Sequence, residues 1–319
     1  MAHAAEVLIL TSELDFATDR ICRELIARGT SFLRLNREQL PKLALELDPI
    51  QPLLRCRSGE AEWEVGSALR AIWWRQGTFD RTPGNLSDPA NQLMKSQWSA
   101  FLRSMMVFPA GLWINHPAAV YAAEVKAVQL RTAATLGFDV PVTRMTNDPD
   151  ADVARAIGPH IALKSIDTLL LRDGDDQLFG YTTLLDWGEV AVPELAGAPV
   201  TVQQPLTDKL DLRVTVLGRQ LWCAAVRKGS DGIEGDWRLT KKDDLAIEDY
   251  VLPDDVAARC LRLVETLGLR FGAVDLAVSD GRYWFIEINP TGEWGWLDTP
   301  RRRLSVAIAE ELSARPPVC

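Results

Sequence analysis

Several features that assign proteins to a class are missing from this sequence. It has no run of about 18 apolar residues, the minimum length of a membrane-spanning helix. Its start has no charged segment before an apolar core, because the apolar residues 7–10 run directly into Thr11, Ser12 and Glu13. A secretory signal is therefore not predicted, and we expect a cytoplasmic protein with no membrane partner.

Histidine and paired cysteine motifs are also scarce. The three histidines are scattered, and the five cysteines form no C-x-x-C pair. This pattern argues against a zinc site and against a disulfide framework. Buried thiols are the favoured interpretation, as for Cys260 on an apolar helical stripe, and a catalytic Cys–His pair is the alternative.

Positive charge is in deficit. The chain has 35 Lys and Arg against 44 Asp and Glu, which gives a net charge of −9. Non-specific nucleic-acid binding needs surplus cations, so we expect no nucleic-acid partner. The 47% hydrophobic and 25% charged residues are typical of globular proteins. At roughly 100–200 residues per domain, 319 residues suggest about two domains.

The first third of the chain has the pattern of an open α/β unit. Apolar runs predict strands over 7–10, 31–35 and 69–74, and a helix over 15–28 that ends at Gly29. No G-x-G-x-x-G follows the first strand, so a dinucleotide site is not supported. Residues 78–88 are rich in Pro, Gly and Asn and are predicted to form a loop.

The remainder mixes strands and helices after a boundary near Asn115. A helix is predicted over 120–136, with Gly137 as its end. Further strands are predicted over 161–164, 200–204, 211–217 and 221–226, and turns at 173–176 and 218–219. A second helix is predicted over 253–267, with Pro253 at its first position.

Two carboxylates lie inside a predicted hairpin near the C-terminus. Strand patterns over 271–278 and 283–288 flank a turn, with Asp275 in the first strand and Glu287 in the second. Burying two carboxylates among apolar neighbours costs free energy unless a cation or hydrogen-bond donors compensate. The pair therefore indicates a binding site, and two charges on a solvated sheet face are the alternative.

The loop length of this hairpin determines whether the carboxylates meet. A three-residue loop over 280–282 would place Asp275 opposite Glu287, with Cβ atoms about 4.5–5.5 Å apart. A two-residue loop would put them on opposite faces. Asn289 shares the face of Glu287, since the two are two residues apart. Two carboxylates and an amide oxygen suit Mg²⁺ held jointly with nucleotide phosphates.

This region resembles a known family. Asp275 and the segment Phe-Ile-Glu-Ile-Asn-Pro at 285–290 look like the metal motif of the ATP-grasp superfamily. Trp-Trp-Arg at 73–75, Thr-Asn-Asp-Pro at 146–149, Asp-Trp-Arg at 236–238 and Gly-Glu-Trp at 292–294 resemble one branch of it. That branch contains the peptide-modifying ligases that make microviridin-type ω-ester and ω-amide peptides, the graspetides.

The resemblance implies a fold, cofactors and partners. The fold class is α/β and α+β, with an N-terminal pre-ATP-grasp domain over 1–115, a central ATP-grasp subdomain over 116–200 and a C-terminal subdomain with the magnesium site over 201–319. The cofactors are ATP and Mg²⁺, and the partner is a ribosomal precursor peptide with a leader and an acidic core. A homodimer is an expectation that rests on the resemblance alone.

It also implies roles for individual residues. The metal ligands are Asp275, Glu287 and Asn289; Lys126 and Lys164 reach the ATP phosphates; Gln203, Gln204 and Leu206 hold adenine; and Asp211 binds the ribose. Arg213 and Arg238 are assigned to the transferred phosphoryl group and the substrate carboxylate. Arg301, Arg302, Arg303 and Trp294 are assigned to peptide docking. The alternatives are a solvated helix face for Lys126, a strand-end charge for Asp211, a surface pair with Asp236 for Arg238 and a solvated helix start for 301–303.

Three functions are compatible with this reading. The first is an ATP-dependent macrocyclase that phosphorylates Asp or Glu side chains of a precursor peptide and couples them to a Ser/Thr hydroxyl or a Lys amine. The second is an ATP-grasp ligase that joins an amino acid to a small acid or a protein terminus. The third is an inactive ATP-grasp module that only binds a leader peptide, which the intact set of predicted site residues argues against.

Overall fold

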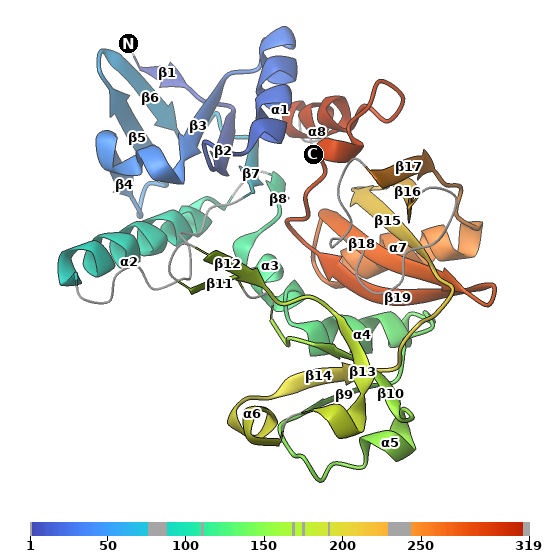
Figure 1. The fold of residues 1–319 in the computed structure, drawn as a ribbon. Coiled ribbons are helices and arrows are strands. Elements are labelled where there is room, and N and C mark those ends of the chain that lie inside the picture. The colour runs from blue at the N-terminus through green and yellow to red at the C-terminus, as the bar shows by residue number, and fades with distance from the viewer. Residues whose placement is uncertain are drawn as a thin grey trace. The chain divides into compact units, whose positions relative to one another are not determined.

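A computed structural model describes residues 2–75, 88–109, 112–167, 170–173, 176–190, 192–228 and 244–314. The chain forms two compact units (Figure 1). Unit 1 comprises Met1–Tyr121, Gly268–Phe271 and Pro290–Cys319, and unit 2 comprises Ala122–Leu267 and Gly272–Asn289. The three-part division at 115/116 and 200/201 stays a prediction.

A parallel sheet forms the centre of unit 1. Its order is β3 (Phe32–Asn36), β2 (Val7–Thr11), β7 (Ala71–Trp74) and β8 (Leu112–Ile114). All five residues of β2 are buried, as expected of a parallel strand covered on both faces. Helices α1 (Phe16–Ala27) and α8 (Leu304–Ser313) pack against each other in this unit. The predicted α/β pattern of the first third is therefore confirmed.

Helix α1 begins at a side-chain cap. Asp15 is the N-cap, and its carboxylate accepts a hydrogen bond from the Thr18 amide. Thr11 Oγ1 donates to Asp15 at 2.7 Å, which orients this cap. Gly29, at φ +67°, ends the helix as predicted.

A second sheet of unit 1 was not predicted. Its order is β1 (His3–Ala4), β6 (Ala61–Val65), β5 (Leu53–Ser58) and β4 (Ala44–Asp48). It shares one core with the parallel sheet and with α2 (Pro89–Ser104), in which Leu54, Trp74 and Leu102 are buried together. Most of the predicted loop over 78–88 lies outside the described residues. The short elements of this unit are η1 (Arg37–Lys42), η2 (Met105–Val107) and η6 (Gly295–Leu297).

Two antiparallel sheets form unit 2. One has the order β13 (Thr183–Asp186), β10 (His160–Lys164), β14 (Val200–Gln203) and β9 (Thr143–Thr146). The other has the order β17 (Leu245–Asp249), β16 (Gln220–Lys228), β15 (Leu210–Leu217), β18 (Phe271–Ser279) and β19 (Arg282–Asn289). The remaining elements are α5 (Val153–Ala156), α6 (Val192–Gly197), α7 (Asp254–Thr266), η3 (Trp187–Glu189) and the ribbon of β11 (Leu170–Asp173) and β12 (Asp176–Phe179).

Most predicted elements of unit 2 are confirmed. Strands β10, β14, β15 and β16 lie where the apolar runs indicated, and Gly218, at φ +58°, lies in the turn between β15 and β16. α7 follows Pro253, which is the N-cap rather than the first helical residue. The predicted turn at 173–176 includes residues outside the described ranges.

The single helix predicted over 120–136 is wrong. The chain forms α3 (Pro117–Ala123) and α4 (Lys126–Thr135), separated by Glu124 and Val125, of which Val125 is extended with ψ 103°. The Gln129 side chain donates to the Ala123 carbonyl at 2.6 Å, which satisfies a group that a continuous helix would have bonded to its own backbone. The break makes Lys126 the first residue of α4.

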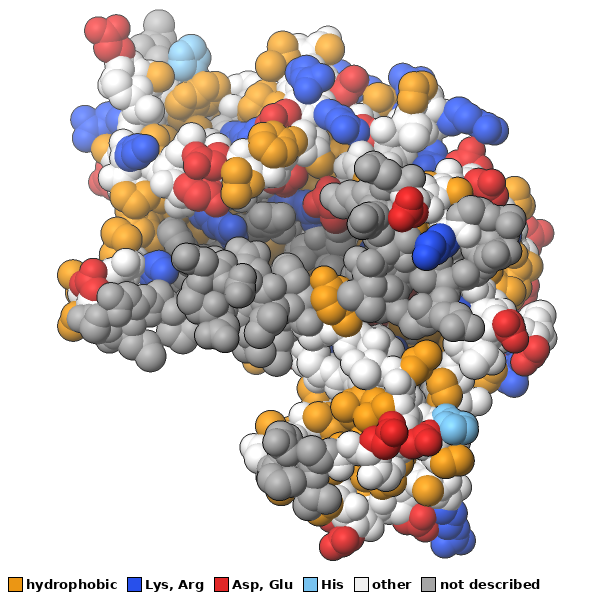
Figure 2. Space-filling view, in the orientation of Figure 1, with side chains coloured by type: hydrophobic (Ala, Val, Ile, Leu, Met, Phe, Trp, Pro, Cys, Tyr) orange, Lys and Arg blue, Asp and Glu red, His pale blue; other side chains and the backbone are white. Residues whose placement is uncertain are grey.

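Charged side chains of both signs are mixed on one face of the molecule (Figure 2). On the face shown in Figure 2, Lys and Arg lie among Asp, Glu and hydrophobic side chains. In the described part of the chain, no helix combines the length and apolar character needed to cross a membrane.

Asn115 ties together three chain segments of unit 1. Its side chain is 1% exposed and donates to the carbonyls of Phe271 at 2.7 Å and Pro290 at 2.8 Å. Its Oδ1 accepts from the amides of Arg270 at 2.7 Å and Phe271 at 2.9 Å. A buried amide with this many backbone partners is costly to remove, because each partner would lose its bond away from water.

We expect Asn115→Leu to lower the free energy of unfolding by about 3 kcal/mol or more, since a side chain of similar size leaves buried backbone groups unsatisfied. Thermal or urea unfolding of the full chain measures this change. Asn147→Leu is the control, because Asn147 is exposed and should change stability by only about 0.5 kcal/mol. Equal effects of the two substitutions would contradict the assigned role of Asn115.

Candidate functional site

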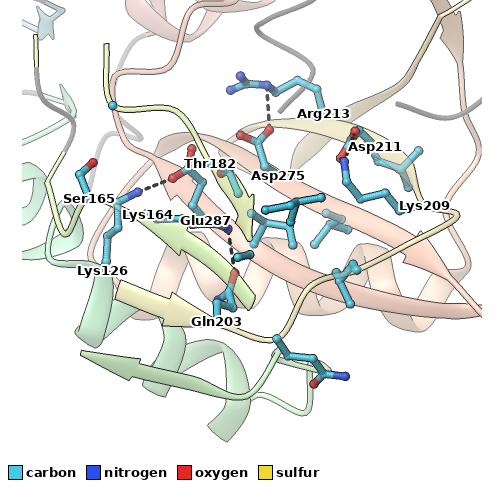
Figure 3. Close-up of a pocket in the computed structure, with 18 of the residues that line it drawn as sticks. Lys126, Lys164, Ser165, Thr182, Gln203, Lys209, Asp211, Arg213, Asp275 and Glu287 are labelled. Carbon is cyan, nitrogen blue, oxygen red and sulfur yellow. Dashed lines mark hydrogen bonds and ion pairs between the residues drawn. The ribbon is translucent and has the colours of Figure 1, made fainter. Parts of the chain in front are cut away.

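The residues predicted to bind nucleotide surround one cavity in unit 2. The space between its lining atoms is about 1080 Å³, which includes open solvent at its mouth. Figure 3 shows its charged and polar lining, which comes from β10, β14, β15, β18, β19 and the start of α4. The lining includes Lys126, Lys164, Gln203, Gln204, Leu206, Lys209, Asp211, Arg213, Asp275 and Glu287.

The two hairpin carboxylates meet as predicted, but by a different route. Asp275 pairs with Glu287 across β18 and β19, while Ser279 pairs with Arg282, so the loop has two residues rather than three. Asp280 and Gly281 both have positive φ, at +51° and +71°, as type I′ hairpin turns require.

A β-bulge restores the register that the short loop would have lost. The pairing shifts between Asp275 and Leu276, which pairs with Phe285, so Ile286 is the extra residue on β19. One extra residue changes which side chains share a face. Asp275 and Glu287 therefore both line the cavity, although the predicted loop length was wrong.

Each of these carboxylates has a cationic partner. Arg213 Nε lies 3.0 Å from Asp275 Oδ1, and Lys126 Nζ forms a short ion pair with Glu287 (Figure 3). The Arg213 and Asp275 side chains are only 10% and 16% exposed. Such burial is tolerated because the opposite charges compensate each other.

Lys164 is oriented by a chain of hydrogen bonds. Its Nζ donates to Gln203 Oε1 at 2.7 Å, and Gln203 Nε2 donates to Thr143 Oγ1 at 2.9 Å. Thr143 Oγ1 donates in turn to the Pro141 carbonyl at 2.8 Å. This series of hydrogen bonds holds the ammonium group of Lys164 in the cavity at the end of β10.

Lys209 is a site residue that the sequence reasoning missed. Its Nζ donates to Asp211 Oδ1 at 2.6 Å, and the two side chains are 11% and 12% exposed. Lys209, Asp211 and Arg213 alternate along the start of β15, so a period-2 pattern of charges was the available signal. The predicted ribose-binding acid therefore lies beside an ammonium group.

Other predicted nucleotide and metal residues differ in their placement. Gln204 and Leu206 line the cavity, and the Gln204 amide donates to the Val142 carbonyl at 2.8 Å. Asn289 ends β19 and is exposed, two residues from Glu287. Arg238 lies outside the described residues, so its assignment stays a prediction.

The residues predicted to dock a peptide lie in unit 1. Arg301 and Arg303 are exposed, whereas Arg302 is 9% exposed and Trp294 is fully buried. The neighbouring Glu293 accepts a bond from Arg75 at 2.7 Å, which joins the Trp-Trp-Arg and Gly-Glu-Trp motifs. The docking role stays a prediction for Arg301 and Arg303, whereas burial keeps most of the Arg302 and Trp294 side chains from the surface.

Three of the four cysteines in the described ranges have the burial expected of structural thiols, and the fourth, Cys22, is half-buried. Cys56, Cys223 and Cys260 are buried. Burial raises the pKa of Cys260 to about 12, and it also raises the pKa of Cys56. The thiols of Cys56 and Cys260 are therefore protonated at neutral pH, which disfavours a nucleophilic role for these two.

The Asp275–Glu287 pair fits a magnesium ion that takes its other ligands in part from phosphate. Asp275 and Glu287 supply hard oxygen ligands from adjacent strands, and both line the cavity. Within the described ranges, no group of three or more His, Cys, Asp or Glu side chains could hold a metal ion alone. This donor set suits a metal that completes its coordination with amide, water or ligand oxygens.

The chain is similar over nearly its whole length to solved ligase structures. One is the RiPP-associated ATP-grasp ligase of Chryseobacterium gregarium in complex with ADP and a leader and core peptide, at 22% identity and TM-score 0.84, over 99% of this chain and 98% of that one. Another is the macrocyclase MdnC from Microcystis aeruginosa MRC bound with precursor peptide MdnA, at 26% identity and TM-score 0.80, over 96% and 98%.

A third is the ATP-grasp ligase PsnB complexed with minimal precursor, Mg and ADP, at 21% identity and TM-score 0.73, over 98% of this chain and 97% of that one. No protein-family model matches the chain, and no curated protein matches it. The predicted fold class and the resemblance carried by the motifs are confirmed.

We expect Lys209→Met to lower the free energy of unfolding by about 3 kcal/mol, because it leaves the Asp211 carboxylate without its ammonium partner. Adding Asp211→Asn should recover at least about 1 kcal/mol relative to additivity. Urea unfolding of both single variants and the double variant gives the coupling energy.

The control is the pair Arg55 and Glu64, whose side chains are 47% and 42% exposed. The same cycle there should give a coupling energy below about 1 kcal/mol. A coupling between Lys209 and Asp211 no larger than that of the exposed pair would refute their assignment as a stabilising ion pair.

Proposed function

We propose that this chain, which has the fold of the ATP-grasp peptide ligases, is an ATP-dependent macrocyclase of the graspetide type. It phosphorylates Asp or Glu side chains of a ribosomally made precursor peptide and couples them to Ser/Thr hydroxyls or Lys amines. The observation that carries the proposal is the cavity in which Asp275 and Glu287 lie opposite each other beside Arg213 and Lys126. Its support comes from the similarity to ligases bound with nucleotide and precursor peptides.

The chemistry needs positive charge, because an anionic carboxylate must approach an anionic phosphate. Lys126 and Lys164 supply ammonium groups to the cavity, and Arg213 supplies a guanidinium that can hold phosphoryl oxygens in a bidentate manner. Asp275, Glu287 and Asn289 would hold Mg²⁺, which neutralises phosphate charge when bound. Arg238, like Arg213, is assigned to the transferred phosphoryl group and the substrate carboxylate on the family resemblance.

Nucleotide binding would exchange one set of ion pairs for another. Lys126 and Arg213 now neutralise Glu287 and Asp275, so no carboxylate of this pair is buried without a cation. Phosphate oxygens would pair with Lys126 and Arg213, and Asp275 and Glu287 would then be available to hold Mg²⁺. The charge of the cavity is thus compensated both with and without ligand.

The second half of the reaction follows from acyl-phosphate chemistry. The substrate carboxylate takes the γ-phosphoryl group and ADP is left. A hydroxyl or amine then attacks the acyl carbon, loses its proton and displaces inorganic phosphate, so each ring removes one water from the peptide. Lys126, Lys164 and Arg213 bind the phosphoryl oxygens during transfer and stabilise the leaving phosphate.

An acidic core peptide would be recognised by charge. Arg301 and Arg303 present exposed cations in an otherwise acidic chain, and such groups steer acidic partners. Trp294 and Arg302 are buried, so we assign them to shaping this segment rather than to direct peptide contact.

We expect Asp275→Asn to reduce ATP turnover by at least about 10²-fold, since it removes a carboxylate from the metal set. Phosphate release with and without precursor peptide measures this. Asp280→Asn is a matched control on the same hairpin, because Asn tolerates the positive φ of that turn residue. Full turnover by the Asp275 variant would show that the metal assignment is wrong.

The proposed reaction has a mass signature. Incubating the chain with ATP, Mg²⁺ and a Ser/Thr- and Asp/Glu-rich precursor peptide encoded beside its gene should lower the peptide mass by about 18 Da per ring. Tandem mass spectrometry then locates the linked side chains. Addition of a free amino acid to the peptide, or an unchanged peptide despite ATP turnover, would instead favour the second ligase hypothesis. Leader binding without ATP turnover would favour the inactive module.

A further inference from the structure

Gln129 makes an unusual set of bonds in unit 2. Its side chain is 3% exposed and lies on α4, one helical turn after Lys126. Its Oε1 accepts from the Ile288 amide at 3.0 Å, and its Nε2 donates to the Ile288 carbonyl at 2.8 Å. The same Nε2 donates to the Ala123 carbonyl at 2.6 Å. One side-chain amide thus serves both backbone groups of a strand residue and the end of α3.

These bonds replace a missing strand neighbour. β19 is the last strand in its sheet order, and its outer edge forms an isolated bridge between Trp284 and Asp139 rather than a strand pairing at Ile288. A primary amide carries the same donor and acceptor as a peptide group, and Gln129 therefore pairs with Ile288 as a neighbouring strand would. This pairing fixes the position of Ile288, at the edge of the sheet, relative to α4.

The residue held in this way lies between two predicted metal ligands. Ile288 separates Glu287 from Asn289 on β19. Lys126, on the same helix as Gln129, pairs with the Glu287 side chain. α4 therefore contacts this short stretch of β19 twice, once through the backbone of Ile288 and once through the carboxylate of Glu287.

We propose that Gln129 is a positioning residue, which aligns the metal-ligand strand with the phosphate-binding lysine without touching the ligand. This inference rests on the proposed function. Gln129 fixes Ile288 and thereby the directions of the flanking Glu287 and Asn289 side chains, and it also closes the break from which α4 and Lys126 start. Replacing a residue that orients a metal ligand without binding the metal itself typically changes metal affinity or activity by about 10–100-fold.

Two variants test this role in the full-length chain. Gln129→Met keeps the side-chain length and removes all three bonds. Gln129→Glu keeps an acceptor for the Ile288 amide but loses both donors. Both should weaken Mg²⁺-dependent binding of ADP, measured by calorimetry, and raise the KM for MgATP by about 10–100-fold. ADP binding without Mg²⁺ should change much less, because the substitutions mainly displace the predicted metal ligands Glu287 and Asn289.

Hydrogen–deuterium exchange gives a readout that does not depend on activity. The peptide containing Ile288 should lose protection in Gln129→Met and keep more of it in Gln129→Glu, where the Ile288 amide still has an acceptor. Val153→Ala is the stability control, since Val153 is 1% exposed in a core cluster of the same unit. That variant should unfold more readily with unchanged KM and unchanged protection at Ile288.

The outcomes separate this inference from the proposed function. Failure of the unsubstituted chain to bind any Mg-nucleotide would refute the proposed function. Normal binding by the unsubstituted chain and equally tight Mg-dependent binding by both Gln129 variants would refute the positioning role alone. Loss of stability with unchanged KM, as in Val153→Ala, would reduce Gln129 to a structural residue and would also overturn the inference.

Discussion

The site depends on compensated charge inside one cavity of unit 2. Asp275, Glu287 and Asp211 have Arg213, Lys126 and Lys209 as partners, and none of these side chains is more than 24% exposed. Uncompensated carboxylates at such positions would be protonated or would destabilise the sheet. The cations therefore have a structural role without ligand, and the same groups are those that phosphate would attract. Because these cations neutralise the carboxylates, the cavity can contain many charged groups without destabilising the fold.

Backbone geometry places these charges. The Asp280–Gly281 turn determines a regular register in which Asp275 and Glu287 would face opposite sides, and the extra residue Ile286 reverses that outcome. The bulge also brings Ile286 into the cavity lining. Bulges are common beside functional sites because they redirect side chains without ending a strand. The cross-strand carboxylate pair thus results from two local irregularities that compensate each other.

The sequence predicted many of the strands and helices, because apolar runs rich in β-branched residues indicate strands that are buried on both faces, as in β2 and β15. It did not predict β4, whose alternating half-exposed residues carry a weak signal. It also placed one helix across Val125, since local propensity cannot see the tertiary bond from Gln129 to Ala123. Two carboxylates among apolar neighbours indicated that Asp275 and Glu287 meet, although side-chain parity with the two-residue loop alone would separate them. The bulge that brings them together was not predictable, because nothing local to Ile286 distinguishes it from its neighbours.

The helix break and the bulge have a common consequence for the site. A continuous helix would have bonded the Ala123 carbonyl internally and left Gln129 without that partner. With the break, Gln129 joins the end of α3 to Ile288, and Lys126 begins α4 opposite Glu287. Two departures from regular secondary structure, one in the helix and one in the strand, therefore meet where the phosphate-binding and metal-binding groups are proposed to act. Strained or irregular backbone is expected where function requires a side-chain arrangement that regular elements cannot supply.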